Sequence, residues 1–205
     1  MRITSVVKDE ESNCIVYRIQ VDDSYSFSVS EDDYFKFSLY EKEELTEEEI
    51  SNIKNAADFM QAKSRAWKFI SFKFRTEKEV RLKLEKEGFN EDIIQNVLDE
   101  LKADGYINDR LYVRKYLHDR GKLNPKSKRR LIQELKARGI KKELILEGLE
   151  ELKIDNILVA EGLVRKKFKD YDFTKKRVER QVYRYLQYRG FNDEEIRTVL
   201  RKLVP

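Results

Sequence analysis

Apolar residues recur along most of the chain with the spacing of amphipathic helices, and one such pattern occurs three times. In each copy, a Val or Leu is followed four residues later by a Leu and eight residues later by a glycine. These glycines, Gly88, Gly139 and Gly190, are 51 residues apart. A repeat of this length predicts one supersecondary unit used in tandem. An apolar stripe follows each glycine at matching positions: Ile94, Ile145 and Ile196; Leu98, Leu149 and Leu200; Leu101, Leu152 and Leu203.

Each unit should contain three helices, and the first unit shows the signals for them. We predict a first helix within residues 61–74. Thr76 and Glu79 form a capping box that opens the second helix. Gly88 falls just past the end of that helix, where a left-handed residue satisfies the last carbonyls without a Cβ clash. Asn90 then caps the third helix.

The later units carry weaker boundary signals. Gly105, Tyr106 and Ile107 open the second unit. Asn124 followed by Pro125 predicts an N-cap and the first position of a helix. In the third unit, we predict that the last two helices begin near Thr174 and at Asn192.

The first thirty residues instead have the pattern of strands. Residues 3–7 are rich in β-branched side chains, and apolar residues alternate with polar ones over 15–21 and 25–29. Turn-forming residues at 9–13 and 22–24 separate these runs. These runs predict a three-stranded meander. One face of this sheet must pack against another element for the sheet to be stable. The aromatic segment 34–37 can supply this cover, together with a helix that opens at the Thr46–Glu49 capping box and bridges to the repeats.

The predicted fold is therefore mainly α-helical: an elongated, curved, solenoid-like array of three three-helix repeats behind a small β-meander and helix domain. We place the acidic, β-rich N-terminal domain at residues 1–60. The three repeats are placed at 61–104, 105–153 and 154–205. Arrays of this type usually bind long partners and rarely enclose a catalytic pocket.

Charge is unevenly distributed along the chain. The formal net charge is +4, but residues 1–60 carry −9 and residues 61–205 carry +13. Residues 105–139 alone carry 11 basic and 3 acidic side chains. The acidic head and the basic array should have different partners, or should contact each other. The alternative for any single charge is a solvated helix face.

Candidate catalytic chemistry is sparse. Cys14 and His118 are the only residues of their types, so neither an internal disulfide nor a Cys/His metal site is expected. Close carboxylates lie at turns and helix N-termini, where they favour the helix dipole. A Gly-rich phosphate loop is lacking. We predict a non-enzyme that needs no cofactor or metal. Without an apolar run long enough for a membrane span, we expect a cytoplasmic protein. We also expect a monomer.

Basic residues are the better candidates for a site. In the second unit they gather around one predicted helix, where Lys126, Arg129 and Arg130 should share a face. In the third, Arg177, Arg180 and Arg184 share a face, and tyrosines 183, 185 and 188 are interleaved with them. About half of these tyrosines should pack inward. The candidates for binding a partner protein or DNA are Lys126, Lys128, Arg129, Arg130, Lys136, Arg138, Lys166, Lys167, Arg177, Arg180 and Arg184.

The repeats resemble those of the RecX family. A Gly-Tyr-Ile followed by an acidic stretch is similar to the best-known signature of that family, and residues 105–110 match it with Asn108 in place of an acid. Residues 125–140 resemble the helix that follows the signature. The resemblance runs from about residue 61 to the end. Residues 1–60 resemble the N-terminal extension of longer RecX proteins from Gram-positive bacteria.

The resemblance implies a regulator of the RecA recombinase that lies in the groove of the RecA–DNA filament and suppresses ATP hydrolysis and strand exchange. Two other readings stay open at this point. One is a module that binds nucleic acid on its own, and it predicts a steep dependence of DNA binding on salt. The other is a generic scaffold. The Leu-x-x-x-Gly corner also resembles a helix-turn-helix joint, although any tight helical corner can look similar.

Overall fold

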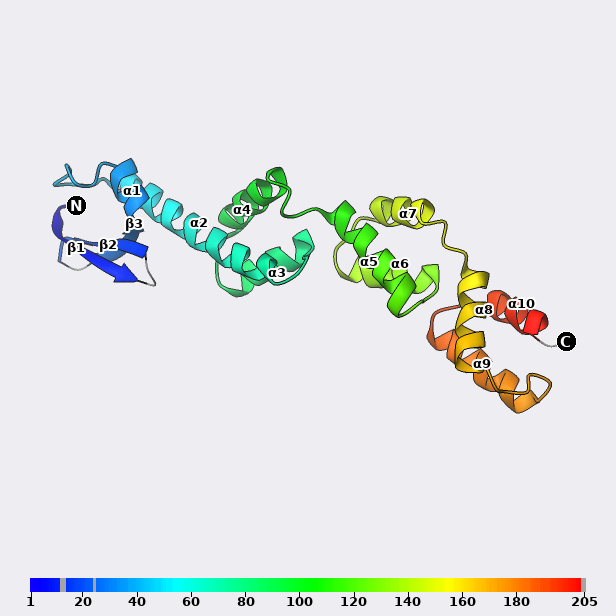
Figure 1. The fold of residues 1–205 in the computed structure, drawn as a ribbon. Helices are drawn as coiled ribbons and strands as arrows, with labels where there is room; N and C mark the ends of the chain where they lie inside the picture. Colours follow the sequence, from blue (N-terminus) through cyan, green and yellow to red (C-terminus); the bar gives the residue numbers. More distant parts are fainter. Residues whose placement is uncertain (12–13, 24, 204–205) are drawn as a thin grey trace. The chain divides into compact units, whose positions relative to one another are not determined.

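A computed structural model describes residues 1–11, 14–23 and 25–203. The described residues form three strands and ten helices (Figure 1). By their internal contacts they divide into two compact units, Met1–Lys73 with Val80–Tyr106, and Phe74–Glu79 with Ile107–Pro205. The elements are β1 (Ile3–Glu11), β2 (Cys14–Val21), β3 (Tyr25–Ser30), α1 (Glu31–Lys36), α2 (Glu47–Ser71), α3 (Glu77–Lys86), α4 (Glu91–Ala103), α5 (Asp109–Leu123), α6 (Lys128–Ala137), α7 (Lys142–Glu151), α8 (Asn156–Lys167), α9 (Lys176–Tyr188) and α10 (Asp193–Leu203).

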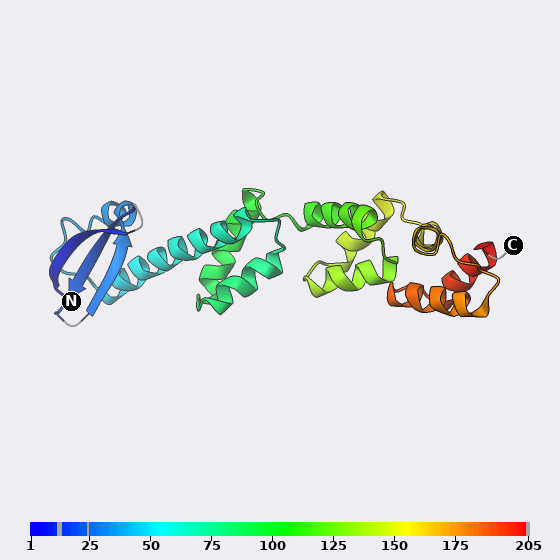
Figure 2. The same ribbon diagram turned by 60° about the horizontal axis from the view of Figure 1, so that its bottom comes forward.

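The N-terminal strands form the predicted meander, an antiparallel sheet in the order β1-β2-β3 (Figure 2). Alternate residues of β2 and β3 face one core, in which Ile19 and Val29 are buried. The helices α1 and α2 cover this core as predicted: Tyr34 of α1 stacks on Tyr17 with ring centroids 3.9 Å apart, and Ile53 of α2 is buried in it.

Two details of the head differ from the prediction. The strand β1 runs to Glu11, so residues 9–11 are not a turn, because they pair with β2 through Glu11 opposite Cys14. Ser12, Asn13 and Ser24, which the turn predictions included, lie outside the described residues. The second turn places Asp22 and Asp23 in the left-handed region, with φ of 49° and 53°.

The helix α2 is continuous, which corrects the prediction of two separate helices. Its N-terminus has the predicted capping box between Thr46 and Glu49. The helix then runs for 25 residues to Ser71, where a bridging helix and a second one within 61–74 were expected. The sequence between Ala57 and Ala62 contains no glycine or proline, so nothing interrupts the backbone hydrogen bonds. The domain boundaries proposed from the sequence stay predictions.

The repeats have the predicted cores. Each unit buries its paired Val/Leu positions before the glycine and the Ile and Leu positions after it. In the second repeat, Leu135, Ile145 and Leu149 belong to one cluster. In the third repeat, Leu186, Ile196 and Leu200 likewise belong to one buried cluster. The last position of the predicted stripe is not equivalent in all three, because Leu101 is fully buried whereas Leu152 is 42% exposed.

The repeat glycines make the predicted left-handed turns. Gly88, Gly139 and Gly190 have φ of 89°, 86° and 90°. The residue after each one donates its N–H to the carbonyl of the Leu four residues before the glycine, at 3.1 to 3.3 Å. Gly105 has φ of 77°, and the ring of Tyr106 packs edge-on against Trp67 at 4.0 Å. Ile107 is buried.

The start of α6 differs from the prediction. Asn124 is the C-cap of α5, and Ser127 is the N-cap of α6. The Ser127 hydroxyl accepts from the N–H of Arg130 at 3.2 Å, so the cap lies three residues later than expected. Lys126 consequently precedes the helix, and it does not share a helical face with Arg129 and Arg130. The helix predicted to begin near Thr174 begins at Lys176, because Asp172 holds Thr174 in a turn.

Candidate nucleic-acid and protein interface

The exposed face of α9 carries a stripe of arginines. Arg177, Arg180 and Arg184 are all exposed and lie three and four residues apart, hence along one face. They make no hydrogen bond or ion pair with any residue that the structure describes. Tyr188 is 84% exposed and continues the stripe one turn beyond Arg184. The buried face of the helix consists of Val178, Val182 and Leu186.

The helix α6 presents a shorter stripe of the same kind. Arg129 and Lys136 are exposed on one face, with Gln133 between them. The face that Leu131 and Leu135 occupy is buried. Among the described residues, neither Arg129 nor Lys136 has a side-chain partner. The two charges are therefore held out to solvent by an otherwise well-packed helix.

The two stripes meet in an open groove of about 650 Å³. Arg129, Arg130 and Gln133 of α6 line it, together with Gln187 and Tyr188 at the end of α9. Residues 190–194 complete the groove. Asp193 and Glu194 place two carboxylates there, at the start of α10. The cationic side of the groove is therefore the one formed by α6, and α9 contributes the neutral side chains of Gln187 and Tyr188.

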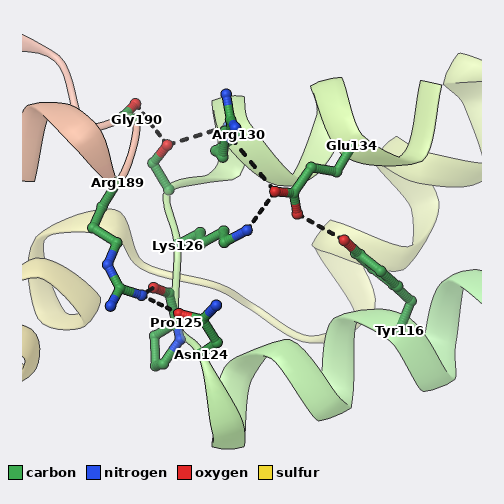
Figure 3. A network of polar contacts seen from close by, with 9 residues as sticks. Tyr116, Asn124, Pro125, Lys126, Arg130, Glu134, Arg189 and Gly190 are labelled. Atoms are coloured by element: carbon green, nitrogen blue, oxygen red, sulfur yellow. Dashed lines mark hydrogen bonds and ion pairs between the residues drawn. The ribbon is translucent and has the colours of Figure 1, made fainter. Parts of the chain in front are cut away.

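Beside this groove, the carboxylate of Glu134 interacts with three side chains (Figure 3). Lys126 and Arg130 form ion pairs with its carboxylate, and the Tyr116 hydroxyl donates to it at 2.7 Å. Burial opposes ionisation of Glu134, but the hydrogen bonds from Lys126 and Tyr116 outweigh it, so its pKa lies below the ordinary value. Lys126 is thereby turned inward, with only 16% of its side chain exposed.

A first joint connects the segment before α3 to the end of α6. The hydroxyl of Thr76 donates to the carbonyl of Arg138 at 2.8 Å while accepting from the N–H of Glu79 at 3.2 Å. The guanidinium of Arg138 in turn pairs with Glu79 at 2.7 Å. It also lies 5.9 and 5.5 Å from the ring centres of Tyr112 and Tyr116. Arg138 is thus held at the joint, with 34% of its side chain exposed.

A second joint repeats this arrangement 51 residues later, between the N-terminus of α6 and the end of α9. The hydroxyl of Ser127 donates to the carbonyl of Gly190 at 2.6 Å (Figure 3). Arg189 occupies the position of Arg138 and bonds to Asn124 and to the carbonyl of Pro125. Arg130 occupies the position of Glu79, and half of its side chain is exposed. Both Thr76 and Ser127 have no exposed surface.

The structure therefore sorts the predicted basic residues into two groups. Lys126 and Arg138 are bound internally, Arg130 is shared between Glu134 and the groove, and Lys167 lies 4.1 Å from the ring centre of Tyr185. The other candidates are exposed and have no side-chain partner among the described residues: Lys128, Arg129, Lys136, Lys166, Arg177, Arg180 and Arg184. The members of this second group on α6 and α9 form our candidate interface, with Arg130 at its edge, whereas Lys166 of α8 lines a separate groove.

Sequence reasoning missed the second role of the capping residues. Thr76 was recognised as a helix cap and Ser127 was not, and neither was expected to bond to the end of another helix. The sequence does contain a signal, because two hydroxyl side chains stand 51 residues apart, in step with the glycines. A hydroxyl at a repeat position can cap its own helix and also donate to a neighbouring carbonyl.

Within the described ranges, no three His, Cys, Asp or Glu side chains gather closely enough to hold a metal ion. No helix in the same ranges has the length and apolar character that crossing a membrane requires. His118 is exposed on α5.

Comparison with family models finds three consecutive matches. Residues 62–101 match the first three-helix domain of RecX, residues 108–149 the second and residues 159–200 the third. Each match lies within one predicted repeat.

Curated relatives and solved structures extend the likeness to the whole chain. The chain is 32% identical to "Regulatory protein RecX" of Streptococcus sanguinis (strain SK36) over 99% of its own length and 77% of the relative. It is 30% identical to the protein of that name from Clostridioides difficile (strain 630), covering 100% and 97%. A structure described as "Crystal structure of regulatory protein RecX" has a TM-score of 0.71 at 25% identity and covers 97% and 98% of the two chains. A RecX structure from Lactobacillus salivarius, at 23% identity, shares the fold over 72% of this chain, with a TM-score of 0.63.

Proposed function

Because the chain belongs to the RecX family of regulatory proteins, we propose that it binds the RecA recombinase, mostly as the RecA–DNA filament, and inhibits its ATPase and strand-exchange activities. In this role it modulates DNA recombination and repair, including during the SOS response. It acts as a cytoplasmic monomer without a cofactor. The observation that carries the proposal is the match of three consecutive domains to RecX, together with likeness over the full chain.

The candidate interface supports a contact with the DNA in the filament. Arginines on successive turns of α9 follow one line, as the phosphates of a strand do, and a guanidinium can bond a phosphate through two N–H groups. Tyr188 and Arg129 lie together at the groove where the α9 and α6 stripes meet. An exposed tyrosine among arginines suits a single strand, because a base can stack on the ring whatever its sequence.

The first test is the ATPase activity of RecA from the same source on single-stranded DNA. We expect the rate to fall when the chain is added well below the RecA concentration. Suppression at such ratios would mean that one molecule affects many RecA subunits. An unchanged rate with a folded sample would reject the proposal.

A second test addresses the interface itself. Replacing Arg129 and Arg130 together by Glu should weaken inhibition, because it reverses two charges in the groove. A matched control replaces Lys141 and Lys142 by Glu; both are exposed at the start of α7, outside the groove. The control should inhibit like the unchanged chain. Equal inhibition by the groove variant at matched stability would remove this surface from the proposal.

The alternative function is a nucleic-acid-binding helical-repeat protein that acts alone. The free arginines of α9 and α6 favour it as well, since their charges need no second protein. It predicts tight binding to naked DNA at physiological salt, with affinity falling steeply as salt rises. The RecA proposal predicts weak binding to naked DNA and strong binding only when RecA is present. Titrating labelled single-stranded DNA with and without RecA separates the two.

A further inference from the structure

A second surface of the repeats is apolar and remains unexplained by DNA binding. Between the end of α5 and the helix α8 lies a groove of about 600 Å³, which adjoins a smaller one of about 270 Å³. Both are lined by Gly121, Pro125 and Leu158, so they form one continuous surface. We call it the leucine groove.

Large aliphatic side chains are exposed along the leucine groove. Leu123 is 84% exposed, Leu158 64% and Leu152 42%. The glycines Gly121 and Gly162 leave further space, because a Cβ atom added to either would find no heavy atom within 4 Å. Apolar side chains gathered in a concave surface mark a binding site more often than isolated exposed ones do.

Around these leucines the charged groups are almost all cations. Lys122, Lys153 and Lys166 line the two grooves, and none has a side-chain partner among the described residues. The one carboxylate in the lining is that of Asp155, which already accepts from the N–H groups at the start of α8. The groove therefore complements a ligand that is apolar in the middle and acidic at its ends.

We infer that the leucine groove docks a segment of a partner protein in which two or three large apolar side chains are flanked by Asp or Glu. The aliphatic leucines favour an aliphatic or aromatic side chain over a nucleobase, which would be held better by the groove between α6 and α9 that Tyr188 lines. Carboxylates of the segment would pair with the rim lysines, and those charges select the segment against neutral or basic ones. The inference rests on the proposed function in that the partner tested is RecA.

The groove itself can be tested without RecA. The probe is a synthetic amidated peptide of sequence Asp-Glu-Leu-Ala-Glu-Leu-Leu-Asp-Glu, and its control has Ser in place of each Leu. We expect millimolar leucine peptide to shift the amide NMR signals of Gly121 and Gly162 in the full chain, and the serine peptide to leave them unchanged. Equal shifts with both peptides, or none with either, would overturn the inference whether or not RecA is regulated.

The partner is then tested with two variants of the groove. Gly162→Leu fills the groove from a helical position where space is free, and Leu158→Asp places a carboxylate in it. Each should weaken binding of the chain to RecA filaments by about tenfold or more. The control Leu146→Asp changes an exposed leucine of α7 outside the groove and should leave binding unchanged. The leucine in Gly162→Leu also favours helix more than glycine does, so this variant should melt no earlier than the unchanged chain.

The results distinguish the two proposals. If the unchanged chain inhibits RecA and both groove variants bind filaments as tightly as Leu146→Asp does, the inference fails while the proposed function stands. If the unchanged chain neither binds nor inhibits RecA but the leucine peptide still binds, the proposed function fails and the groove serves another protein. Photo-crosslinking from position 123 should label a RecA peptide of the stated composition. Crosslinks to DNA instead would overturn the inference.

Discussion

The two joints have similar geometry but different electrostatics. In both, a buried hydroxyl caps its own helix and donates to a carbonyl at the end of another helix, that of Arg138 in the first joint and that of the repeat glycine Gly190 in the second. In the first joint, Glu79 neutralises Arg138 in a partly buried ion pair. In the second, the residue equivalent to Glu79 is Arg130, and Arg189 bonds to amide and carbonyl oxygens instead. Exchanging one carboxylate for a guanidinium thus replaces this ion pair by a cation at the edge of the groove that Tyr188 lines.

A repeat can therefore keep its packing while it acquires a binding surface. The hydroxyl, the glycine and the apolar positions fix how the helices meet, and they are shared by both joints. The position of Glu79 in the first joint and Arg130 in the second can differ in charge, because the hydrogen bond from the hydroxyl to the carbonyl does not depend on it. Stability and binding are therefore carried by different residues of the same joint, and substitutions should separate them.

The largest effect should come from the glycines. Gly88→Ala should lower the free energy of unfolding by roughly 1 kcal/mol, because the left-handed conformation is unfavourable for alanine. No further loss is expected, since nothing lies within 4 Å of the new methyl group. Gly139→Ala would bring a Cβ within 2.5 Å of the Cβ of Lys78, and Gly190→Ala would bring one within 2.7 Å of the Ser127 hydroxyl. We expect each of these two variants to lose roughly 3 kcal/mol in the free energy of unfolding, as measured with urea. Equal losses at all three glycines would refute the close contact in the joints.

The capping hydroxyls should have the next largest effect. Thr76→Ala and Ser127→Ala each remove a helix cap and leave a carbonyl without its donor, so we expect a loss of roughly 2 kcal/mol in the free energy of unfolding. Asn90 caps α4 from an exposed position. Asn90→Ala therefore serves as the control, at roughly 1 kcal/mol. If the three variants lose the same stability, the hydroxyl-to-carbonyl bonds contribute nothing beyond capping.

The charged position should separate stability from binding. Glu79→Gln weakens the ion pair with Arg138, which is partly exposed, so we expect a loss of about 1 kcal/mol. Arg130→Gln, at the equivalent position, should change the free energy of unfolding by less than about 0.5 kcal/mol. It should instead reduce affinity for RecA–DNA filaments in an anisotropy titration. The reverse result, with stability lost at Arg130 and binding lost at Glu79, would contradict the assignment of roles.

The smallest effect concerns pH and Glu134. The pKa of Glu134 is lower in the folded chain than its ordinary value of 4.5, so folding favours its charged form. The stability this adds is present above pH 4.5 and is lost as the pH falls through the folded pKa. Glu134→Gln should therefore flatten the decline of stability below that pH, as followed by thermal melting. If the stability of the variant declines as steeply as that of the unchanged chain, other carboxylates cause the loss of stability at low pH.

Local patterns were enough to predict much of the fold. The alternation in residues 15–29 predicted the meander, and the 51-residue period predicted the glycine turns and the buried Ile and Leu positions. These features depend on neighbours in sequence, so their signals are local. The errors arose where signals competed. Asn124 and Pro125 form a typical helix start, yet Ser127 provides the cap because its hydroxyl also reaches Gly190.

The repeat, most of the elements and the inventory of basic residues could be predicted from the sequence alone, because periodicity and capping are properties of neighbouring positions. Which of those cations are available depends on tertiary contacts. Lys126 and Arg138 stand in the same basic run as Arg129, yet they meet Glu134 and Glu79 and are held inward. A charge is neutralised by whatever lies within a few ångströms of it, and for Arg138 that partner is 59 residues away in the chain.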